Sequence, residues 1–188
     1  VNNVYAYPEL VWELDFWGKY RSATDAARAQ LVGSQYGMRT IQMSLISAVT
    51  STYFQLLDYL SKLDISYSTL ESRAQGLKIL EERFAHGIVA EIDVNQSQIQ
   101  WALAAASVPA YQRSIATTQS ALSILLGHMP RQIKTGVDLL NQPLPPDIPI
   151  GIPSQLLERR PDILEAEQNC IAANEQIGVA IAMRLPSI

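Results

Sequence analysis

Hydrophobic positions along this chain follow two different periods. Residues 4–16 alternate between apolar and polar side chains, which is the pattern of a strand with one apolar face. From Lys19 onward the apolar positions recur in steps of three and four, which is the period of a helix. The change occurs at Trp17-Gly18, so the sequence predicts a strand that leads directly into a helix.

The alternating run places its aromatic and aliphatic residues on one face and its acidic residues, including Glu13 and Asp15, on the other. Two interpretations stay open at this point: an edge strand of a soluble sheet, or a membrane strand with its apolar face toward lipid. A membrane strand needs about 9–11 residues, and the run is long enough. On the membrane interpretation, the residues facing lipid or its interface are Trp12, Leu14, Phe16 and Trp17.

Residues 19–85 contain no proline and predict one long helix. Twelve positions in its second half follow steps of three and four without a gap, and only one of them is charged. A seam sustained over this many heptads is typical of a coiled coil, so the helix is expected to lie against another helix. The seam positions are Ile46, Val49, Tyr53, Leu56, Leu60, Leu63, Tyr67, Leu70, Ala74, Leu77, Glu81 and Phe84.

The partner helix is predicted to follow a turn at residues 86–91. Gly87 can take the left-handed conformation that ends a helix, and Glu91 or Asp93 suits the start of the next one. The second helix is expected over about residues 92–126. Because the connection is short, the two helices should form an antiparallel hairpin.

Prolines punctuate the rest of the chain. Pro109 lies inside the second helix and predicts a kink or a break there. Six of the ten prolines lie between residues 143 and 161, which indicates an extended connector. Pro153 and Pro161 each suit the first position of a helix, and the last helix is expected over about residues 162–182.

Composition and candidate chemistry narrow the function classes. Charged residues make up 17% of the chain and the formal net charge is −4, so a nucleic-acid partner is not expected. The single Cys170 cannot form an intramolecular disulfide. His86 is interpreted as a residue of the hairpin turn, and His128 as a residue of a helix end. No phosphate-binding loop or nucleophile motif occurs, so neither an enzyme nor a cofactor is expected. The acidic group Glu81, Glu82, Glu91 and Asp93 is interpreted as a solvated surface rather than a metal site, because its spacing resembles no metal loop.

Four segments in one order resemble the TolC-like outer-membrane efflux factors, in particular the lipoprotein subfamily paired with resistance-nodulation-division pumps. They are "WELDFWGKYRSATDAARAQ", "RFAHGIVAEIDVNQSQ", "SALSILLGHMP" and "IPSQLLERRPDILEAEQNCIAANEQIGVAIA", and the resemblance covers essentially all 188 residues. A single short motif would be weak, whereas four in register are specific.

The resemblance implies a mainly α fold: a long antiparallel helical hairpin, coiled-coil-like, that forms a tunnel wall, with a short β-barrel strand, within a trimeric α/β-barrel channel. Residues 1–18 would be the outer-membrane strand and residues 19–127 the periplasmic hairpin, with its turn at 86–91 and a break near Pro109. Residues 128–160 would be an equatorial connector, and residues 161–188 would begin a second repeat with a helix leading to the next strand. A signal peptide, a lipid-carrying cysteine, the first strand and most of the second repeat are expected outside this chain.

The resemblance also implies function and partners. The expected protein is a homotrimeric exit duct in the Gram-negative outer membrane that extends into the periplasm and conducts substrates passively. It would contact outer-membrane lipid, a periplasmic adaptor (membrane fusion) protein and, through the adaptor, an inner-membrane efflux pump. The residues expected to contact the adaptor are Arg83, His86, Gly87, Glu91 and Asp93. The alternative is a soluble periplasmic or cytoplasmic coiled-coil scaffold, which would share the heptads and the hairpin but would not need the aromatic strand.

Overall fold

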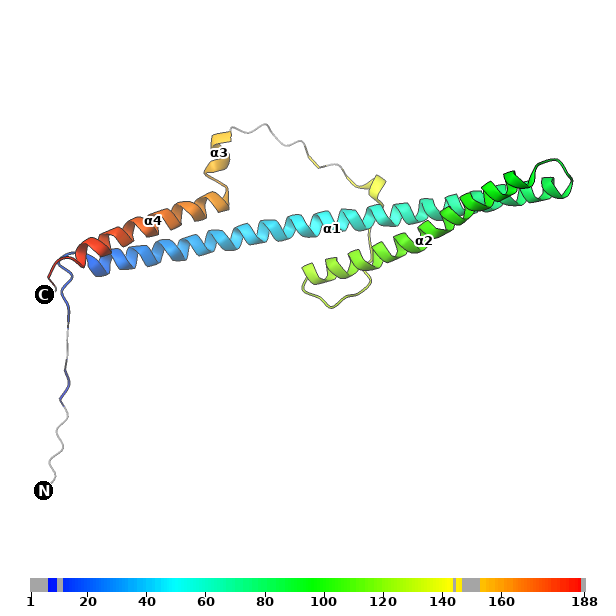
Figure 1. Cartoon of the computed structure of the whole chain (residues 1–188). Helices are drawn as coiled ribbons and strands as arrows, with labels where there is room; N and C mark the ends of the chain where they lie inside the picture. The colour runs from blue at the N-terminus through cyan, green and yellow to red at the C-terminus, as the bar shows by residue number, and fades with distance from the viewer. Residues whose placement is uncertain (1–6, 10–11, 144, 147–152, 187–188) are drawn as a thin grey trace, which may run out of the picture. The chain divides into compact units, whose positions relative to one another are not determined.

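The computed structural model describes residues 7–9, 12–143, 145–146 and 153–186, and these residues are mainly helical. They divide into two compact units, which we call the terminal unit (residues 1–43 and 148–188) and the hairpin unit (residues 44–147). The elements, labelled in Figure 1, are α1 (Lys19–Ala85), α2 (Glu91–Leu125), the 3-10 helix η1 (Leu139–Asn141), α3 (Pro153–Leu157) and α4 (Pro161–Ala182).

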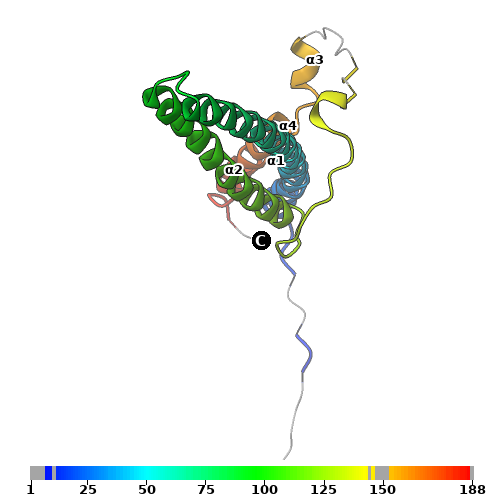
Figure 2. The same cartoon turned by 90° about the vertical axis from the view of Figure 1, so that its right-hand side faces the viewer.

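The hairpin unit consists of the second part of α1 and the antiparallel helix α2, which lie side by side in Figures 1 and 2. The side-chain amide of Gln112 on α2 donates to the hydroxyl of Tyr67 on α1 at 2.8 Å. Leu56 of α1 is completely buried and Leu122 of α2 is nearly so. The predicted hairpin of two long helices is therefore confirmed, and the 67 residues of α1 correspond to about 100 Å of helix.

Both helices of the hairpin end in the same way. At the end of α1 the N–H of Ile88 donates to the carbonyl of Arg83 at 2.9 Å, and Gly87 has a φ of +68°. At the end of α2 the N–H of His128 donates to Ser123 at 2.9 Å, and Gly127 has a φ of +72°. These are Schellman motifs, in which glycine takes the left-handed position at no steric cost. The predicted ending at Gly87 is confirmed.

The break predicted near Pro109 is not formed, because α2 continues through this residue as one helix. The kink that the same residue predicts stays a prediction. Proline lacks an N–H, so the carbonyl of Ala105 loses its helical donor and the ring crowds the preceding turn. The residues before it are mostly alanine, which keeps this part of α2 in the helical conformation. Val108, next to the proline, is buried, so packing also holds this turn in place.

In the terminal unit, α4 lies antiparallel to the first part of α1, as Figure 1 shows. The closest approaches run in opposite order along the two helices, and glycine takes part in each. A Cβ added to Gly33 would lie 3.4 Å from the Cβ of Gln168, and one added to Gly178 would lie 2.9 Å from the hydroxyl oxygen of Ser22. Small residues therefore bring these two helices together; the buried ones include Ala26, Ala29, Ala172 and Ala182.

Both α3 and α4 begin at a proline, as predicted. Arg160, before Pro161, is extended with φ −70° and ψ 121°, because the helical region is disfavoured for a residue that precedes proline. Its guanidinium group forms two hydrogen bonds with Asp162, of 3.0 Å from Nε and 2.5 Å from Nη2. This pair raises the pKa of Arg160 and lowers the pKa of Asp162.

The strand predicted for residues 4–16 is not formed by the part of it that the structure describes. Residues 7–9 and 12–15 have no regular secondary structure, and residues 4–6 and 10–11 lie outside the described residues. A strand needs a neighbouring strand to pair its backbone N–H and C=O groups. No described segment of this chain is a strand, so the alternating pattern has no ladder to join.

Candidate functional site

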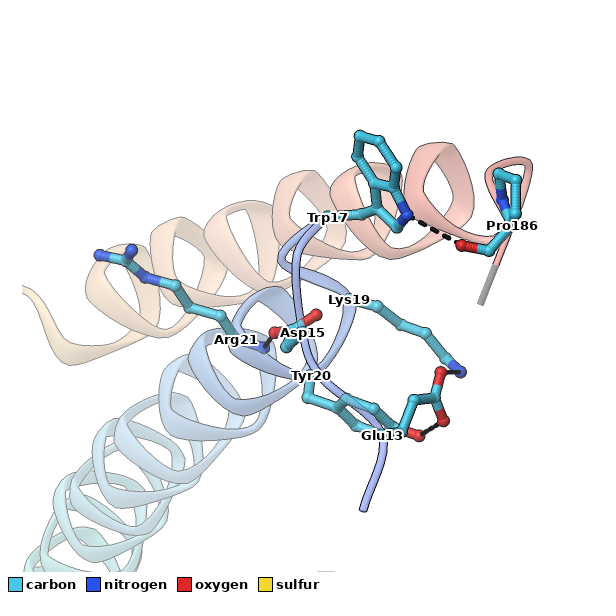
Figure 3. Close-up of polar contacts among 7 residues, drawn as sticks. All are labelled: Glu13, Asp15, Trp17, Lys19, Tyr20, Arg21 and Pro186. Carbon is cyan, nitrogen blue, oxygen red and sulfur yellow. Dashed lines mark hydrogen bonds and ion pairs between the residues drawn. The ribbon is translucent and has the colours of Figure 1, made fainter. Parts of the chain in front are cut away.

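Two exposed features and one packed surface carry the residues singled out in the sequence. The first feature is the junction of residues 13–22, where the chain enters α1, shown in Figure 3. The second is the turn of residues 83–93 between α1 and α2. The packed surface is the seam of α1.

At the junction, Gly18 turns the chain with a φ of +73°, a conformation that glycine tolerates and other residues rarely adopt. Its carbonyl accepts the first hydrogen bond of α1, from the N–H of Ser22 at 2.8 Å. The carboxylate of Asp15 accepts from the backbone N–H of Arg21 at 2.9 Å. Asp15 therefore caps α1 from outside the helix, where a negative charge also favours the helix dipole.

Glu13 binds the first turn of α1 with its side chain. Its carboxylate accepts a short hydrogen bond from the hydroxyl of Tyr20 and lies 3.4 Å from the ammonium nitrogen of Lys19. The hydrogen bond to Glu13 raises the pKa of the Tyr20 hydroxyl, and the charge of Glu13 raises the pKa of Lys19. Together with Asp15, it ties the segment before Gly18 to the start of the helix.

Trp17 links the junction to the segment that follows α4 in the terminal unit. Its indole N–H donates to the carbonyl of Pro186 at 2.9 Å, across 169 positions of sequence. Figure 3 shows the indole ring turned toward Pro186 at the end of α4. We expected Trp17 only as an interfacial aromatic residue, and nothing in the local sequence pattern indicates this contact.

The four residues predicted to face a membrane are exposed in the chain. Trp12 is 78% exposed and Trp17 is 49% exposed, and Leu14 and Phe16 lie between these values. Large apolar side chains gathered at this density on a surface indicate a region that another molecule or a lipid phase covers. No helix within the described residues is both long and apolar enough to cross a membrane.

The five residues predicted at the hairpin turn are all exposed. Gly87 ends α1, and Arg83 supplies the carbonyl that closes the motif. The carboxylate of Asp93 accepts from the backbone N–H of Ala90 at 3.3 Å, so Asp93 also caps α2. The side chains of His86 and Glu91 form no hydrogen bond with the backbone within the described residues. Asp93 lines a groove between the two helices with Arg73 on α1, a residue that the sequence patterns did not indicate.

Ile88 was also missed by sequence reasoning. It is 69% exposed at the tip of the turn. Its backbone N–H closes the Schellman motif, which holds this side chain outward. Within the described residues, no three His, Cys, Asp or Glu side chains gather into a group that could hold a metal ion.

The predicted seam of α1 is covered unevenly. Leu56 is 0% exposed, and seven further seam residues of α1 are half-buried: Val49, Tyr53, Leu60, Leu63, Leu70, Ala74 and Leu77. Ile46 near the middle of α1 is 66% exposed, and Tyr67 and Phe84 are also exposed. The described residues of this chain therefore cover only part of the seam.

Comparisons with known proteins agree with this arrangement. The sequence profile of the outer membrane efflux protein family matches residues 1–128. The pyoverdine export outer membrane protein OpmQ of Pseudomonas putida is 33% identical over 177 residues, which cover 94% of this chain and 38% of that protein. A membrane protein from Pseudomonas aeruginosa superposes with a TM-score of 0.84 at 32% identity, covering 94% of this chain and 41% of that one. The outer-membrane channel OprN superposes with a TM-score of 0.83 at 33% identity, covering 94% and 40%. The chain thus spans about two-fifths of the length of the proteins that it matches.

Proposed function

Because the chain belongs to the outer membrane efflux protein family, we propose that it is part of an outer-membrane exit duct that passively conducts substrates out of a tripartite efflux or export system. The observation that carries this proposal is a long helical hairpin whose apolar positions are only partly covered by its own chain. A hairpin of this kind is a wall element, which needs neighbours of the same kind to complete a tube.

The neighbours that we propose are further copies of the same protein, arranged as a homotrimer. Exposed aliphatic side chains occur along both helices of the hairpin unit, among them Ile46, Ile65 and Ile79 on α1 and Ile99, Leu103 and Ile124 on α2. Each Å² of apolar surface removed from water contributes about 25 cal/mol, so contacts over a hairpin of this length would hold adjacent walls together. The polar surface that stays uncovered would line the water-filled duct.

We propose the hairpin turn as the contact for a periplasmic adaptor protein, which would connect the duct to an inner-membrane pump. The residues assigned to this contact are Arg83, His86, Gly87, Glu91 and Asp93, and Ile88 joins them as an apolar anchor. The support is that these side chains are exposed on a turn whose backbone is fixed by the Schellman motif. A fixed, exposed turn loses little conformational entropy on binding.

We propose that residues 1–18, which precede α1, contribute to the part of the duct that lies in the outer membrane. Trp12, Leu14, Phe16 and Trp17 would face lipid, and strand pairing would be supplied by segments that lie outside this chain or in other subunits. Residues 128–160 would form the equatorial connector and residues 161–188 the start of the second repeat. Conduction through such a duct needs a polar lumen and a firm wall and requires neither a cofactor nor a catalytic group, so we propose no enzymatic activity.

The proposal is tested with the complete protein in two ways. The protein is reconstituted in a planar lipid bilayer and, separately, it is returned to cells that lack it. We expect the protein to be extracted only with detergent, to migrate as a trimer and to restore the export of a fluorescent efflux substrate such as ethidium. A Leu63→Asp variant should lose the trimer, because a charge on the seam would be buried against a neighbouring helix. A soluble monomer, or export that is equal in the presence and absence of the protein, would contradict the proposal.

The adaptor contact has its own test, which uses Glu91 and Asp93 as a matched pair. Glu91→Lys reverses a charge without removing a cap, and is expected to weaken crosslinking to the adaptor while the trimer stays intact. Asp93→Asn keeps an oxygen acceptor for the N–H of Ala90, so it separates charge from capping. If crosslinking is unchanged in Glu91→Lys, the turn is not the adaptor contact, even where export by the wild-type duct is intact.

A further inference from the structure

We infer that Trp17 is a positioning residue: its hydrogen bond to Pro186 fastens the segment that enters α1 to the segment that leaves α4, so that the two chain segments run from the helices in a fixed register. The bond is 2.9 Å long and joins residues 169 positions apart. All its parts lie within the terminal unit, so this role does not depend on conduction.

The segment that carries Trp17 is held to the start of α1 by hydrogen bonds. Gly18 turns the backbone with a positive φ, and its carbonyl and the Asp15 carboxylate receive two of the free N–H groups at the start of α1. Glu13 adds contacts to Lys19 and Tyr20. The segment from Glu13 to Trp17 is thus tied to the helix at three points, and Figure 3 shows these contacts surrounding the turn. An indole held on such a turn points in one direction.

The side that carries Pro186 is also defined. The last turn of α4 closes with the N–H of Met183 donating to Val179 at 3.0 Å and that of Leu185 donating to Ala182 at 3.1 Å. Pro186 follows, and proline cannot donate a backbone hydrogen bond that would continue this turn. Its carbonyl points toward the indole of Trp17 and accepts the hydrogen bond from it.

Close helix packing brings the two sides together. Gly178 on α4 faces Ser22 on α1 near the junction, where a Cβ added to Gly178 would lie 2.9 Å from the serine hydroxyl oxygen. A recess of about 210 Å³ separates the two segments and is lined by residues of both, including Leu14 and Trp17 on one side and Leu185 and Pro186 on the other. Among the hydrogen bonds of the described residues, only the one from Trp17 crosses this recess. The position of Trp17 in the fold therefore decides how the recess closes.

The alternative is that Trp17 matters only as a large apolar side chain. A hydrogen bond and a packing contact are separated by replacing the indole with 3-benzothienylalanine, in which sulfur takes the place of N–H and the ring shape is kept. A single hydrogen bond contributes about 0.5–1.5 kcal/mol net. This corresponds to about a two- to tenfold change in the ratio between the form in which the two walls of the recess are close and the form in which they are apart.

The test uses the complete protein with Cys170→Ser to remove the natural thiol, and with Leu14→Cys and Leu185→Cys on the two walls of the recess. A short bifunctional thiol reagent reports how often the walls are close. We expect benzothienylalanine at position 17 to lower the crosslink yield, by at most about tenfold, and the same substitution at Trp12, whose indole makes no hydrogen bond within the described residues, to leave it unchanged. Equal yields for the substituted and unsubstituted protein would overturn the assignment.

A second measurement needs no substitution, so it stands even if the variants fail to fold. The indole N–H of Trp17 in the wild-type protein, labelled with ¹⁵N, should exchange with solvent more slowly than that of Trp12, although both rings are largely exposed. Exchange of the Trp17 indole as fast as that of Trp12 would mean that the bond to Pro186 is not maintained, and would overturn the positioning role.

Discussion

Gly178 of α4 and Ser22 of α1 lie so close that a Cβ on residue 178 would be 2.9 Å from the serine hydroxyl oxygen. The nearest atom is the end of a side chain that can rotate, so this contact alone tolerates a small change. Further along the same two helices, a Cβ on Gly33 would already contact the Cβ of Gln168 and the amide oxygen of Asn169, each at 3.4 Å, so a side chain that extends beyond its Cβ would collide with α4.

Gly33→Leu is therefore expected to separate α4 from α1. Leucine carries three carbons beyond its Cβ, and overpacking of this kind costs about 1–3 kcal/mol. Hydrogen exchange followed by mass spectrometry should show faster exchange in α4. Gly76→Leu in the same helix is the control, because no atom lies within 4 Å of its added Cβ and leucine favours the helix more than glycine does. Unchanged exchange in α4 of the Gly33 variant would contradict the prediction.

Leu56→Ala should strongly destabilise the hairpin unit, because Leu56 is completely buried between α1 and α2. The expected cost is about 2–5 kcal/mol in the free energy of unfolding. Ile46→Ala, at an exposed position of the same seam, should cost no more than about 0.5 kcal/mol in the isolated chain. Urea unfolding followed by circular dichroism measures both. Similar losses for the two variants would mean that α2 does not cover the seam as described.

Gly87→Ala should weaken the ending of α1. A residue with a Cβ at a φ of +68° is strained by about 1 kcal/mol, and the same holds for Gly127→Ala at the end of α2. Gly136→Ala is the matched control, because Gly136 has ordinary backbone angles and open space around it. Denaturation midpoints should fall for the first two variants only. A midpoint for Gly136→Ala that falls as far would point to a general intolerance of alanine.

The Arg160–Asp162 pair predicts a pH dependence at the start of α4. The guanidinium group lowers the pKa of Asp162 below the ordinary aspartate value of about 3.9. Asp162 is therefore ionised at a lower pH when folded than when unfolded, so its contribution is complete above the unfolded pKa and is lost as the pH falls through the folded pKa. A carboxyl ¹³C titration by NMR should find the lowered pKa, and Arg160→Ala should return it to the ordinary range. Both groups are exposed, so the effect on overall stability should be small.

The helical part of this fold was predictable because its signals are local. The period of three and four, the absence of proline from residues 19–85 and the glycine at position 87 together gave the bounds of α1 within a residue of those observed. The prolines at 153 and 161 marked the first residues of α3 and α4. In each case a few neighbouring residues decide the conformation, so no knowledge of tertiary contacts was needed.

The misses have a different physical origin. The alternation of residues 4–16 correctly describes side chains that could share a face, but a strand exists only with a partner, and none is present in the described part of this chain. Pro109 is unfavourable in a helix, yet α2 continues through it, with Val108 buried beside it. The contact of Trp17 with Pro186 depends on the antiparallel register of α1 and α4, which no local pattern encodes.

The proline in α2 has a mechanical consequence for the hairpin. A helix bends most easily where a carbonyl has no helical donor, and in this pair of helices proline creates that condition in α2 alone. Between Lys19 and Ala85 no such point exists in α1. A force applied at the turn would therefore bend α2 near Pro109 more easily than it bends α1. One helix of the hairpin would be compliant and the other stiff.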